Sequence, residues 1–217
     1  MGQRPPLDLS LYLVTDPVMC QKFGLTETVS AAVWAGVSAV QLRDVDATDD
    51  ELVVLGRQVL AALRGTGVPL ILNDRVHLVG AVGAQGAHVG QGDLAVAQAR
   101  AVLGPSPYLG LSVQTVEHVV AAAQYAESAV DYLGVGPVWG TATKVDAAAP
   151  GGLQRLGQIT SASPWPCVAI GGINLERLVR VRRAGAVGAA VVSAICGQPD
   201  VAAATRELRA AWDAAPA

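Results

Sequence analysis

The stretch Leu70–Leu94, LILNDRVHLVGAVGAQGAHVGQGDL, contains two short apolar runs that each end abruptly in polar residues or glycine. The first run, Leu70–Leu72, ends in Asn73 and Asp74, and the second, Gly86–Val89, ends in the letters GQGD. Each run is typical of a strand buried on both faces, and the segment between them has a helical pattern. Strand, helix, strand predicts parallel neighbours whose carboxyl ends lie on the same side.

Two carboxylates follow these strands. Asp74 comes directly after the first strand and Asp93 closes the loop after the second, so we expect them to lie beside each other at the mouth of a sheet or barrel. Carboxylate and phosphate oxygens are the ligands that Mg²⁺ prefers. The alternative is that both residues only cap the helices that follow. We favour the metal site because other loops of the chain are suited to phosphate.

The composition indicates a soluble α/β protein. Of its 217 residues, 52% are hydrophobic and 15% are charged, which favours strands buried on both faces. The net charge of −3 gives no general attraction to nucleic acid or acidic membranes. No apolar run reaches the roughly 18 residues that span a bilayer. The start, MGQRPPLDLS, lacks a signal-peptide pattern, so a cytoplasmic location is expected.

A short apolar run followed by an amphipathic stretch occurs eight times. The expected strands are Leu11–Val14, Ala39–Arg43, Leu70–Asn73, Gly86–Val89, Tyr108–Ser112, Tyr132–Val135, Cys167–Ile170 and Gly188–Val192. The expected helices are Thr26–Trp34, Asp49–Leu63, Arg75–Val82, Leu94–Val102, Val116–Ala126, Gly152–Ile159, Leu175–Ala184 and Val201–Ala214. Thr48, Thr115 and Asn174 are good N-caps. Residues 1–217 are therefore expected to form one (β/α)8 TIM-barrel domain rather than an open sheet.

Polar residues and glycine gather where these strands end, which is the active-site face of such barrels. Gln41 and Arg43 alternate along one strand and face the same way. An arginine at a barrel mouth suggests a bound anion, since its planar group suits phosphate. The alternative is an internal ion pair with Asp74 or Asp93.

Two further loops fit phosphate. Gly171-Gly172 follows the seventh strand and Val192-Ser193 the eighth, where barrels commonly bind a phosphate monoester, although simple tight turns are the alternative. The segment Trp139–Lys144 places two hydroxyls and an ammonium within the long loop Pro137–Gly151, which is expected to act as a lid over a polyanion.

The three histidines are interpreted as structural. His88 lies inside the fourth strand, and His77 and His118 lie on helices, so none is expected to be catalytic.

Eight motifs, in this order, identify a family. They are LYLVTD at 11–16, VQLRD at 40–44, LILNDR at 70–75, GAHVGQGDL at 86–94, GLSV at 110–113, DYLGVGPVWGTATK at 131–144, AIGGIN at 169–174 and AAVVSAI at 189–195. The chain resembles thiamine-phosphate synthase almost end to end. The resemblance implies a (β/α)8 transferase that joins 4-amino-2-methyl-5-hydroxymethylpyrimidine diphosphate to hydroxyethyl-methylthiazole phosphate, giving thiamine phosphate and pyrophosphate.

The resemblance also implies roles for individual residues. Asp74 and Asp93 match Mg²⁺ ligands. The residues that match contacts to the pyrimidine diphosphate are Gln41, Arg43, Asn73, Ser112 and Lys144. Those that match the thiazole-phosphate and pyrophosphate side are Thr141, Thr143, Gly172, Val192 and Ser193. Arg43, Lys144 and Ser112 would be the catalytic residues, with small molecules as the only expected partners and a homo-oligomer left open.

Two positions depart from the family pattern. Val45 stands where the family usually has lysine, which would project toward the same phosphate if the strand continued that far. Gln114 stands where a histidine often follows the fifth strand. Two alternatives therefore stay open: a paralogue that tautomerises the thiazole carboxylate phosphate, and a non-catalytic or degenerate barrel that binds thiamine intermediates.

Overall fold

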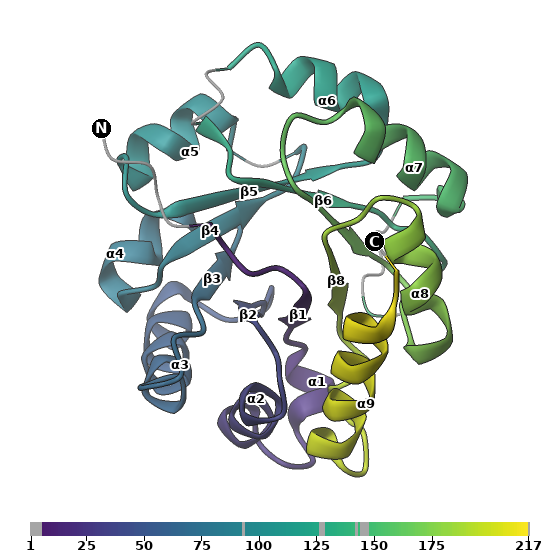
Figure 1. The fold of residues 1–217 in the computed structure, drawn as a ribbon. Helices are drawn as coiled ribbons and strands as arrows, with labels where there is room; N and C mark the ends of the chain where they lie inside the picture. The colour runs from purple at the N-terminus through teal and green to yellow at the C-terminus, as the bar shows by residue number, and fades with distance from the viewer. Residues whose placement is uncertain (1–5, 93, 126–128, 142, 144–147, 217) are drawn as a thin grey trace.

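The protein folds as a closed parallel barrel. The computed structural model describes residues 6–92, 94–125, 129–141, 143 and 148–216. Eight parallel strands pair in sequence order, and β1 pairs with both β2 and β8 to close the ring. Figure 1 shows the strands at the centre with the helices around them. The predicted (β/α)8 architecture is confirmed.

The strands follow the short apolar runs of the sequence. They are β1 Leu11–Val14, β2 Ala39–Leu42, β3 Leu70–Asn73, β4 Gly86–Val89, β5 Tyr108–Val113, β6 Tyr132–Val135, β7 Cys167–Ile170 and β8 Gly188–Val191. The bounds of β1, β3, β4, β6 and β7 are those expected. Three strands differ by one residue, since β2 ends at Leu42, β5 continues to Val113 and β8 ends at Val191.

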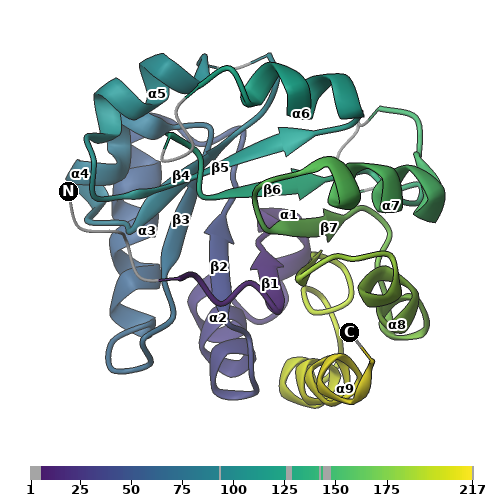
Figure 2. The same cartoon turned by 45° about the horizontal axis from the view of Figure 1, so that its top comes forward.

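Most helices also lie where the sequence predicts them. They are α1 Pro17–Cys20, α2 Leu25–Trp34, α3 Asp49–Ala62, the 3₁₀ turn η1 Val76–Leu78, α4 Val79–Val82, α5 Val96–Leu103, α6 Val116–Ala122, α7 Gly152–Ala162, α8 Leu175–Arg183 and α9 Val201–Ala214. The last helix packs beside α2 and α8, which closes the helical layer as β8 closes the barrel (Figure 2). Within the described residues, no helix combines the length and apolar character that a bilayer crossing requires.

Helix α6 ends at Ala122 rather than Ala126, and α7 continues to Ala162 rather than ending at Ile159. Two further helical features differ from the expectation. The helix expected at Arg75–Val82 is a 3₁₀ turn followed by one short α-helical turn. A short helix that was not expected, α1, follows β1 directly. Asp16 caps it, because its Oδ1 accepts a hydrogen bond of 2.9 Å from the backbone N–H of Met19, and Pro17 occupies the first turn.

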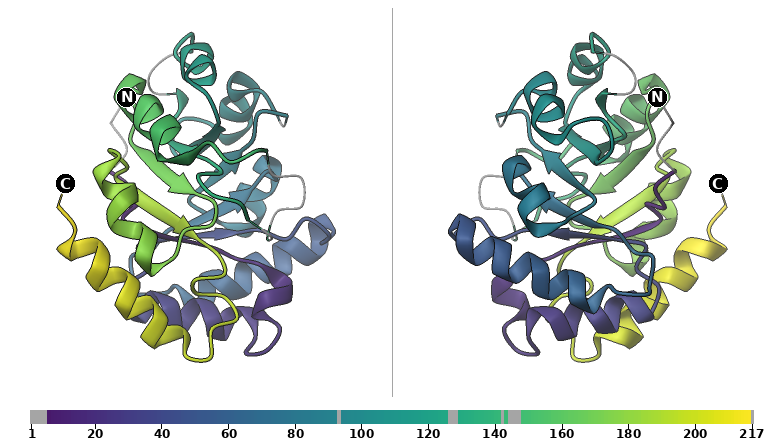
Figure 3. Two further views of the ribbon diagram at one scale, coloured as in Figure 1. Left: turned by 90° about the vertical axis from the view of Figure 1, so that its right-hand side faces the viewer. Right: turned by 90° about the vertical axis from the view of Figure 1, so that its left-hand side faces the viewer.

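The side chains of β1 alternate between two apolar clusters. Leu11 and Leu13 of β1 point outward and pack with helix residues such as Val29 of α2. Tyr12 and Val14 point inward, where they belong to a separate cluster inside the barrel. Both faces are buried, which explains why the strands have near-continuous apolar sequences. The two side views in Figure 3 show this arrangement of strands within helices.

Candidate active site

A cavity of about 190 Å³ opens where the strands end. Every predicted substrate-binding residue that the structure describes lines it: Gln41, Arg43, Asn73, Ser112, Thr141, Thr143, Gly172, Val192 and Ser193. These residues come from strands and loops along the whole chain, and the closed barrel brings them to one rim. Lys144 and Asp93 lie outside the described residues.

Arg43 follows directly from the end of β2 and is held by its backbone. Its N–H donates to Thr15 Oγ1 at 3.0 Å, and the backbone N–H of Thr15 donates to the carbonyl of Gln41 at 2.9 Å. Both Gln41 and Arg43 line the cavity, as expected for alternate residues. Among the described residues no carboxylate forms an ion pair with Arg43, so the alternative pairing with Asp74 is not found.

Asp74 directly follows β3 and has an unusual backbone conformation. Its φ of 58° lies in the left-handed region, which aspartate tolerates better than most residues and which often marks functional positions. The conformation is held on both sides: Asp74 N–H donates to the carbonyl of His88 at 2.8 Å, and Val76 N–H donates to the carbonyl of Asp74 at 2.8 Å. The Nδ2 group of Asn73 donates to Asp74 Oδ2 at 2.6 Å. The exposed carboxylate is thus oriented by its neighbour.

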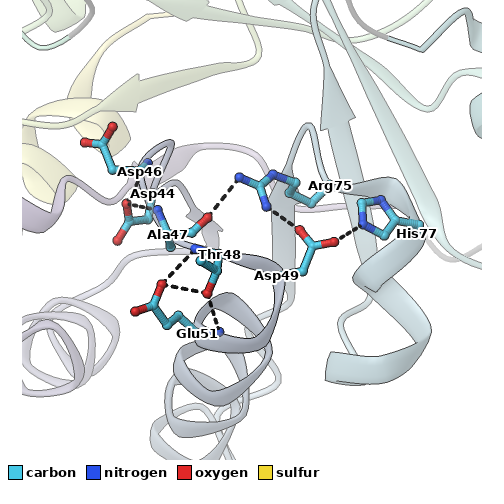
Figure 4. Close-up of polar contacts among 8 residues, drawn as sticks. All are labelled: Asp44, Asp46, Ala47, Thr48, Asp49, Glu51, Arg75 and His77. Carbon is cyan, nitrogen blue, oxygen red and sulfur yellow. Dashed lines mark hydrogen bonds and ion pairs between the residues drawn. The ribbon is translucent and has the colours of Figure 1, made fainter.

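The next residue, Arg75, turns away from the cavity. Its guanidinium pairs with Asp49 at the start of α3 and donates to the carbonyl of Ala47 at 3.0 Å (Figure 4). His77 Nε2 lies 2.7 Å from the other oxygen of Asp49. Hydrogen bonds from His77 and then from Arg75 hold the pKa of the Asp49 carboxyl below its ordinary value. These contacts anchor the turn that carries Asp74.

The start of α3 is fixed independently of this ion pair. Thr48 Oγ1 accepts from the N–H of Glu51 at 3.3 Å, so the predicted N-cap is confirmed, and Glu51 Oε2 accepts from the N–H of Thr48 at 2.8 Å, which completes a capping box (Figure 4). Asp44 Oδ1 accepts from the N–H groups of Asp46 and Ala47, both at 3.2 Å. The chain therefore makes a tight polar turn immediately after Arg43.

Because of this turn, a side chain at position 45 does not project toward the same phosphate site as Arg43, contrary to the expectation for a continued strand. A residue two positions beyond Arg43 shares its side only if the strand continues, but β2 ends at Leu42. Val45 is 56% exposed and is not part of the cavity lining. Its side chain lies on the surface of the turn rather than beside the predicted phosphate site.

The loops after β6 and β7 are joined at the rim. The N–H of Trp139 donates to the carbonyl of Gly171 at 3.0 Å. Gly172 has a φ of 61°, and a Cβ there would lie 2.6 Å from the carbonyl oxygen of Gly140, so only glycine fits. Arg177 of α8 donates to the carbonyl of Gly172. After β8, Val192 and Ser193 begin a series of turns rather than a helix.

The two predicted threonines of the β6–α7 loop contact each other. Thr141 Oγ1 lies 2.8 Å from Thr143 Oγ1, and the N–H of Thr143 donates to Thr141 Oγ1 at 3.3 Å. Both side chains line the cavity. Gln114, at the position where the family often has histidine, lines it as well.

Polar side chains that the sequence interpretation did not assign to the site occupy the barrel interior. Gln41 Nε2 donates to Tyr12 OH at 3.0 Å, and Tyr12 OH lies 2.8 Å from Tyr132 OH. Tyr132 OH lies 3.0 Å from His88 Nδ1, and His88 Nε2 lies 2.9 Å from Ser112 Oγ. Tyr12, Tyr132 and His88 all line the cavity. Their inward positions follow from the alternation along each strand, which was the available signal.

Comparisons with known proteins agree with this geometry. The family model described as thiamine monophosphate synthase matches residues 11–195. The chain is 47% identical to thiamine-phosphate synthase of Azorhizobium caulinodans over 94% of this chain and 95% of that protein. It is 48% identical to thiamine-phosphate synthase of Xanthobacter autotrophicus over 95% of this chain and 96% of that protein. The solved thiamine phosphate pyrophosphorylase of Pyrococcus furiosus superposes with a TM-score of 0.85 at 32% identity, covering 97% of this chain and 98% of that one.

Proposed function

The chain belongs to the thiamine monophosphate synthase family, and we propose that its rim cavity joins a pyrimidine diphosphate to a thiazole phosphate with release of pyrophosphate. The protein is thus a transferase that forms thiamine phosphate. The observation that carries the proposal is the convergence of the predicted substrate-binding residues on one cavity at the carboxyl ends of the strands. The two curated relatives named above are thiamine-phosphate synthases, which favours this activity over the tautomerase and non-catalytic alternatives.

The ends of the cavity suit the two substrates differently. Arg43, from the β2 end, supplies a guanidinium for the diphosphate, and Lys144 would add an ammonium from the lid loop. Gly172 and Ser193 leave room for the phosphate of the thiazole close to the backbone. Gln41 and Ser112 also line the cavity, and their polar side chains would hold the pyrimidine ring.

We also assign a magnesium site to Asp74 and Asp93. Asp74 does not itself line the cavity, but it directly follows the lining residue Asn73, and its exposed carboxylate accepts a hydrogen bond from Nδ2 of Asn73. Within the described residues there is no cluster of three His, Cys, Asp or Glu side chains, so oxygens of the diphosphate would complete the ligand set. Mg²⁺ bound there would neutralise negative charge on the leaving pyrophosphate.

The protein's own contribution is charge stabilisation and alignment rather than proton transfer. The thiazole nitrogen is already a nucleophile, so the bond to be made needs no general base. The carbon–oxygen bond to the diphosphate breaks as negative charge grows on the leaving group, and the cations of Arg43 and Lys144 would stabilise that charge. The two rings must be held in line within one cavity, which accounts for a site rich in fixed polar groups.

A cytoplasmic location and a single catalytic domain over residues 1–217 complete the proposal. All three cysteines lie in the described part of the chain and are unpaired and buried, which is typical of a reducing compartment.

The activity is tested by mixing both substrates with Mg²⁺ and measuring pyrophosphate and thiamine phosphate together. The proposal expects the two products in equal amounts and neither when one substrate is omitted. Pyrophosphate without thiamine phosphate, or no product at all, would contradict it.

A further inference from the structure

The hydrogen bonds inside the barrel form one continuous chain from Gln41 to Ser112. It passes through Tyr12, Tyr132 and His88 and crosses from β2 to β5 beneath the cavity. Tyr12 is 1% exposed and Tyr132 is 0% exposed, so neither hydroxyl can turn to solvent for a partner. A buried hydroxyl hydrogen without an acceptor is costly, so the partners inside the chain decide where each hydrogen points.

The direction of the chain follows from its first member. Gln41 Nε2 can only donate, so the hydrogen of Tyr12 must go to its other partner, Tyr132. Tyr132 has then accepted from Tyr12, and its own hydrogen must go to Nδ1 of His88. Burial raises the pKa of both tyrosines above the ordinary value, so both hydroxyls keep their hydrogens.

The direction ends at Ser112. With Nδ1 of His88 accepting from Tyr132, the ring hydrogen lies on Nε2 and is donated to Ser112 Oγ. The hydroxyl hydrogen of Ser112 is then left for a group in the cavity, which Ser112 lines. At the other end, Nε2 of Gln41 is committed to Tyr12, so the amide presents its oxygen as an acceptor.

Two glycines on neighbouring strands make space for this chain. A Cβ at Gly110 would lie 2.3 Å from His88 Nδ1 and 2.5 Å from Tyr132 OH. A Cβ at Gly134 would lie 2.8 Å from His88 Cε1. Strand register places Gly110 directly opposite both His88 and Tyr132. The local sequence of β5 and β6 is therefore fitted to these side chains.

We propose that His88 is a positioning residue that, together with Tyr12 and Tyr132, fixes Ser112 as a hydrogen-bond donor and Gln41 as an acceptor toward the pyrimidine ring. The inference rests on the proposed function for the identity of the ring. A 4-aminopyrimidine carries an amino group that donates and ring nitrogens that accept. It therefore complements a site with one acceptor, Gln41, and one donor, Ser112. His88, which the sequence interpretation treated as purely structural, thereby acts on the substrate through Ser112.

The first test measures the tautomer of His88 directly in the free protein. The chain has three histidines, so ¹⁵N-histidine spectra of the protein and of His88→Gln assign the ring. The proposal expects the hydrogen on Nε2, and a hydrogen on Nδ1 would overturn it. This readout needs no turnover, so it stands or falls independently of the proposed activity.

The second test is a double-mutant cycle between His88 and Ser112. His88→Leu should raise KM for the pyrimidine diphosphate about tenfold, the worth of one hydrogen bond, and leave KM for the thiazole phosphate unchanged. Adding His88→Leu to Ser112→Ala should cost nothing further, because its effect passes through Ser112. If the effects of the two substitutions on KM for the pyrimidine diphosphate multiplied in the double variant, the proposal would be overturned.

A milder pair of variants covers the case in which His88→Leu does not fold. Tyr132→Phe removes only the hydroxyl that donates to His88, and it should raise the same KM. Tyr108→Phe is the matched control. Tyr108 packs against the apolar cluster inside the barrel, but it lies at the start of β5, whereas Ser112 lies near the end of that strand. Equal effects of the two variants, or a change in KM for the thiazole phosphate alone, would contradict the assignment.

Discussion

The guanidinium carbon of Arg177 lies 4.8 Å from the centre of the Trp139 ring. The same side chain donates to the carbonyl of Gly172, so one arginine on α8 contacts both the loop after β6 and the loop after β7. Thr141 follows in the first loop and Gly172 belongs to the second, so this contact links the two loops that border the proposed thiazole-phosphate end of the cavity.

Arg177→Leu should therefore weaken binding of the thiazole phosphate. The lost stacking and hydrogen bond are together worth about 1–2 kcal/mol, or roughly 5- to 30-fold in KM. KM for the pyrimidine diphosphate should change little. Arg183→Leu is the control, since Arg183 lies exposed on the same helix. The measurement is steady-state kinetics with each substrate varied in turn. Equal KM values for the thiazole phosphate in Arg177→Leu and Arg183→Leu would contradict the account.

The magnesium assignment predicts a change in metal dependence. Asp74→Asn and Asp93→Asn should each raise the Mg²⁺ concentration needed for half-maximal rate by at least about tenfold, because a carboxylate ligand is replaced by a neutral amide. Asp50→Asn, which alters an exposed carboxylate of α3, should leave the Mg²⁺ titration unchanged. If the Mg²⁺ titration were unchanged in both Asp74→Asn and Asp93→Asn, the assignment of the magnesium site to these residues would be wrong.

Lys144 is expected to act mainly as pyrophosphate leaves. Lys144→Ala should lower kcat and kcat/KM together, which is the pattern of a transition-state contact. The chain has one other lysine, Lys22, whose ammonium lies 4.8 Å from the ring of Phe23, and Lys22→Ala is the matched control. If only KM rose in Lys144→Ala, the ammonium would contribute to binding and not to the chemical step.

The ion pair at Asp49 predicts a pH-dependent contribution to stability. Its pKa is lowered in the folded state, so the stabilisation is present above the ordinary carboxyl value of about 3.9 and is lost as the pH falls below it. The difference in denaturation midpoint between the protein and Asp49→Asn should be largest near neutral pH and shrink in acid. Asp50→Asn should show no such trend, and a difference for Asp49→Asn that is constant with pH would argue against the ion pair.

Val45 provides a test of the turn after β2. Because Val45 lies exposed outside the cavity, Val45→Lys should change kcat/KM for the pyrimidine diphosphate less than about threefold, whereas a charged hydrogen bond would be worth about 10- to 100-fold. A gain in that larger range would mean that residue 45 reaches the diphosphate after all.

The sequence predicts the barrel because its strands are short, doubly buried and regularly spaced. Residues at strand ends such as Arg43 and Ser112 could be assigned to one rim because parallel strands share that edge. Errors arose where a local interaction overrides the periodicity. Asp16 and Pro17 start a helix too short to show a period, and the side chain of Asp44 ends β2 early.

The hydrogen bonds that run from Gln41 to Ser112 inside the barrel could not be predicted from the sequence, and the reason is different. His88 and Ser112 meet only because β4, β5 and β6 pair in a register that places Gly110 between His88 and Tyr132. That register depends on closure of the whole barrel and leaves no pattern within any single strand.

The central claim, that one rim cavity holds both reacting molecules, is tested most directly by a crystal structure of the protein with thiamine phosphate, pyrophosphate and Mg²⁺. The account predicts the pyrimidine ring between Gln41 and Ser112, the thiamine phosphate group against Gly172 and Ser193, and pyrophosphate beside Arg43. Product bound outside this cavity, or with the pyrimidine ring away from Gln41 and Ser112, would contradict it.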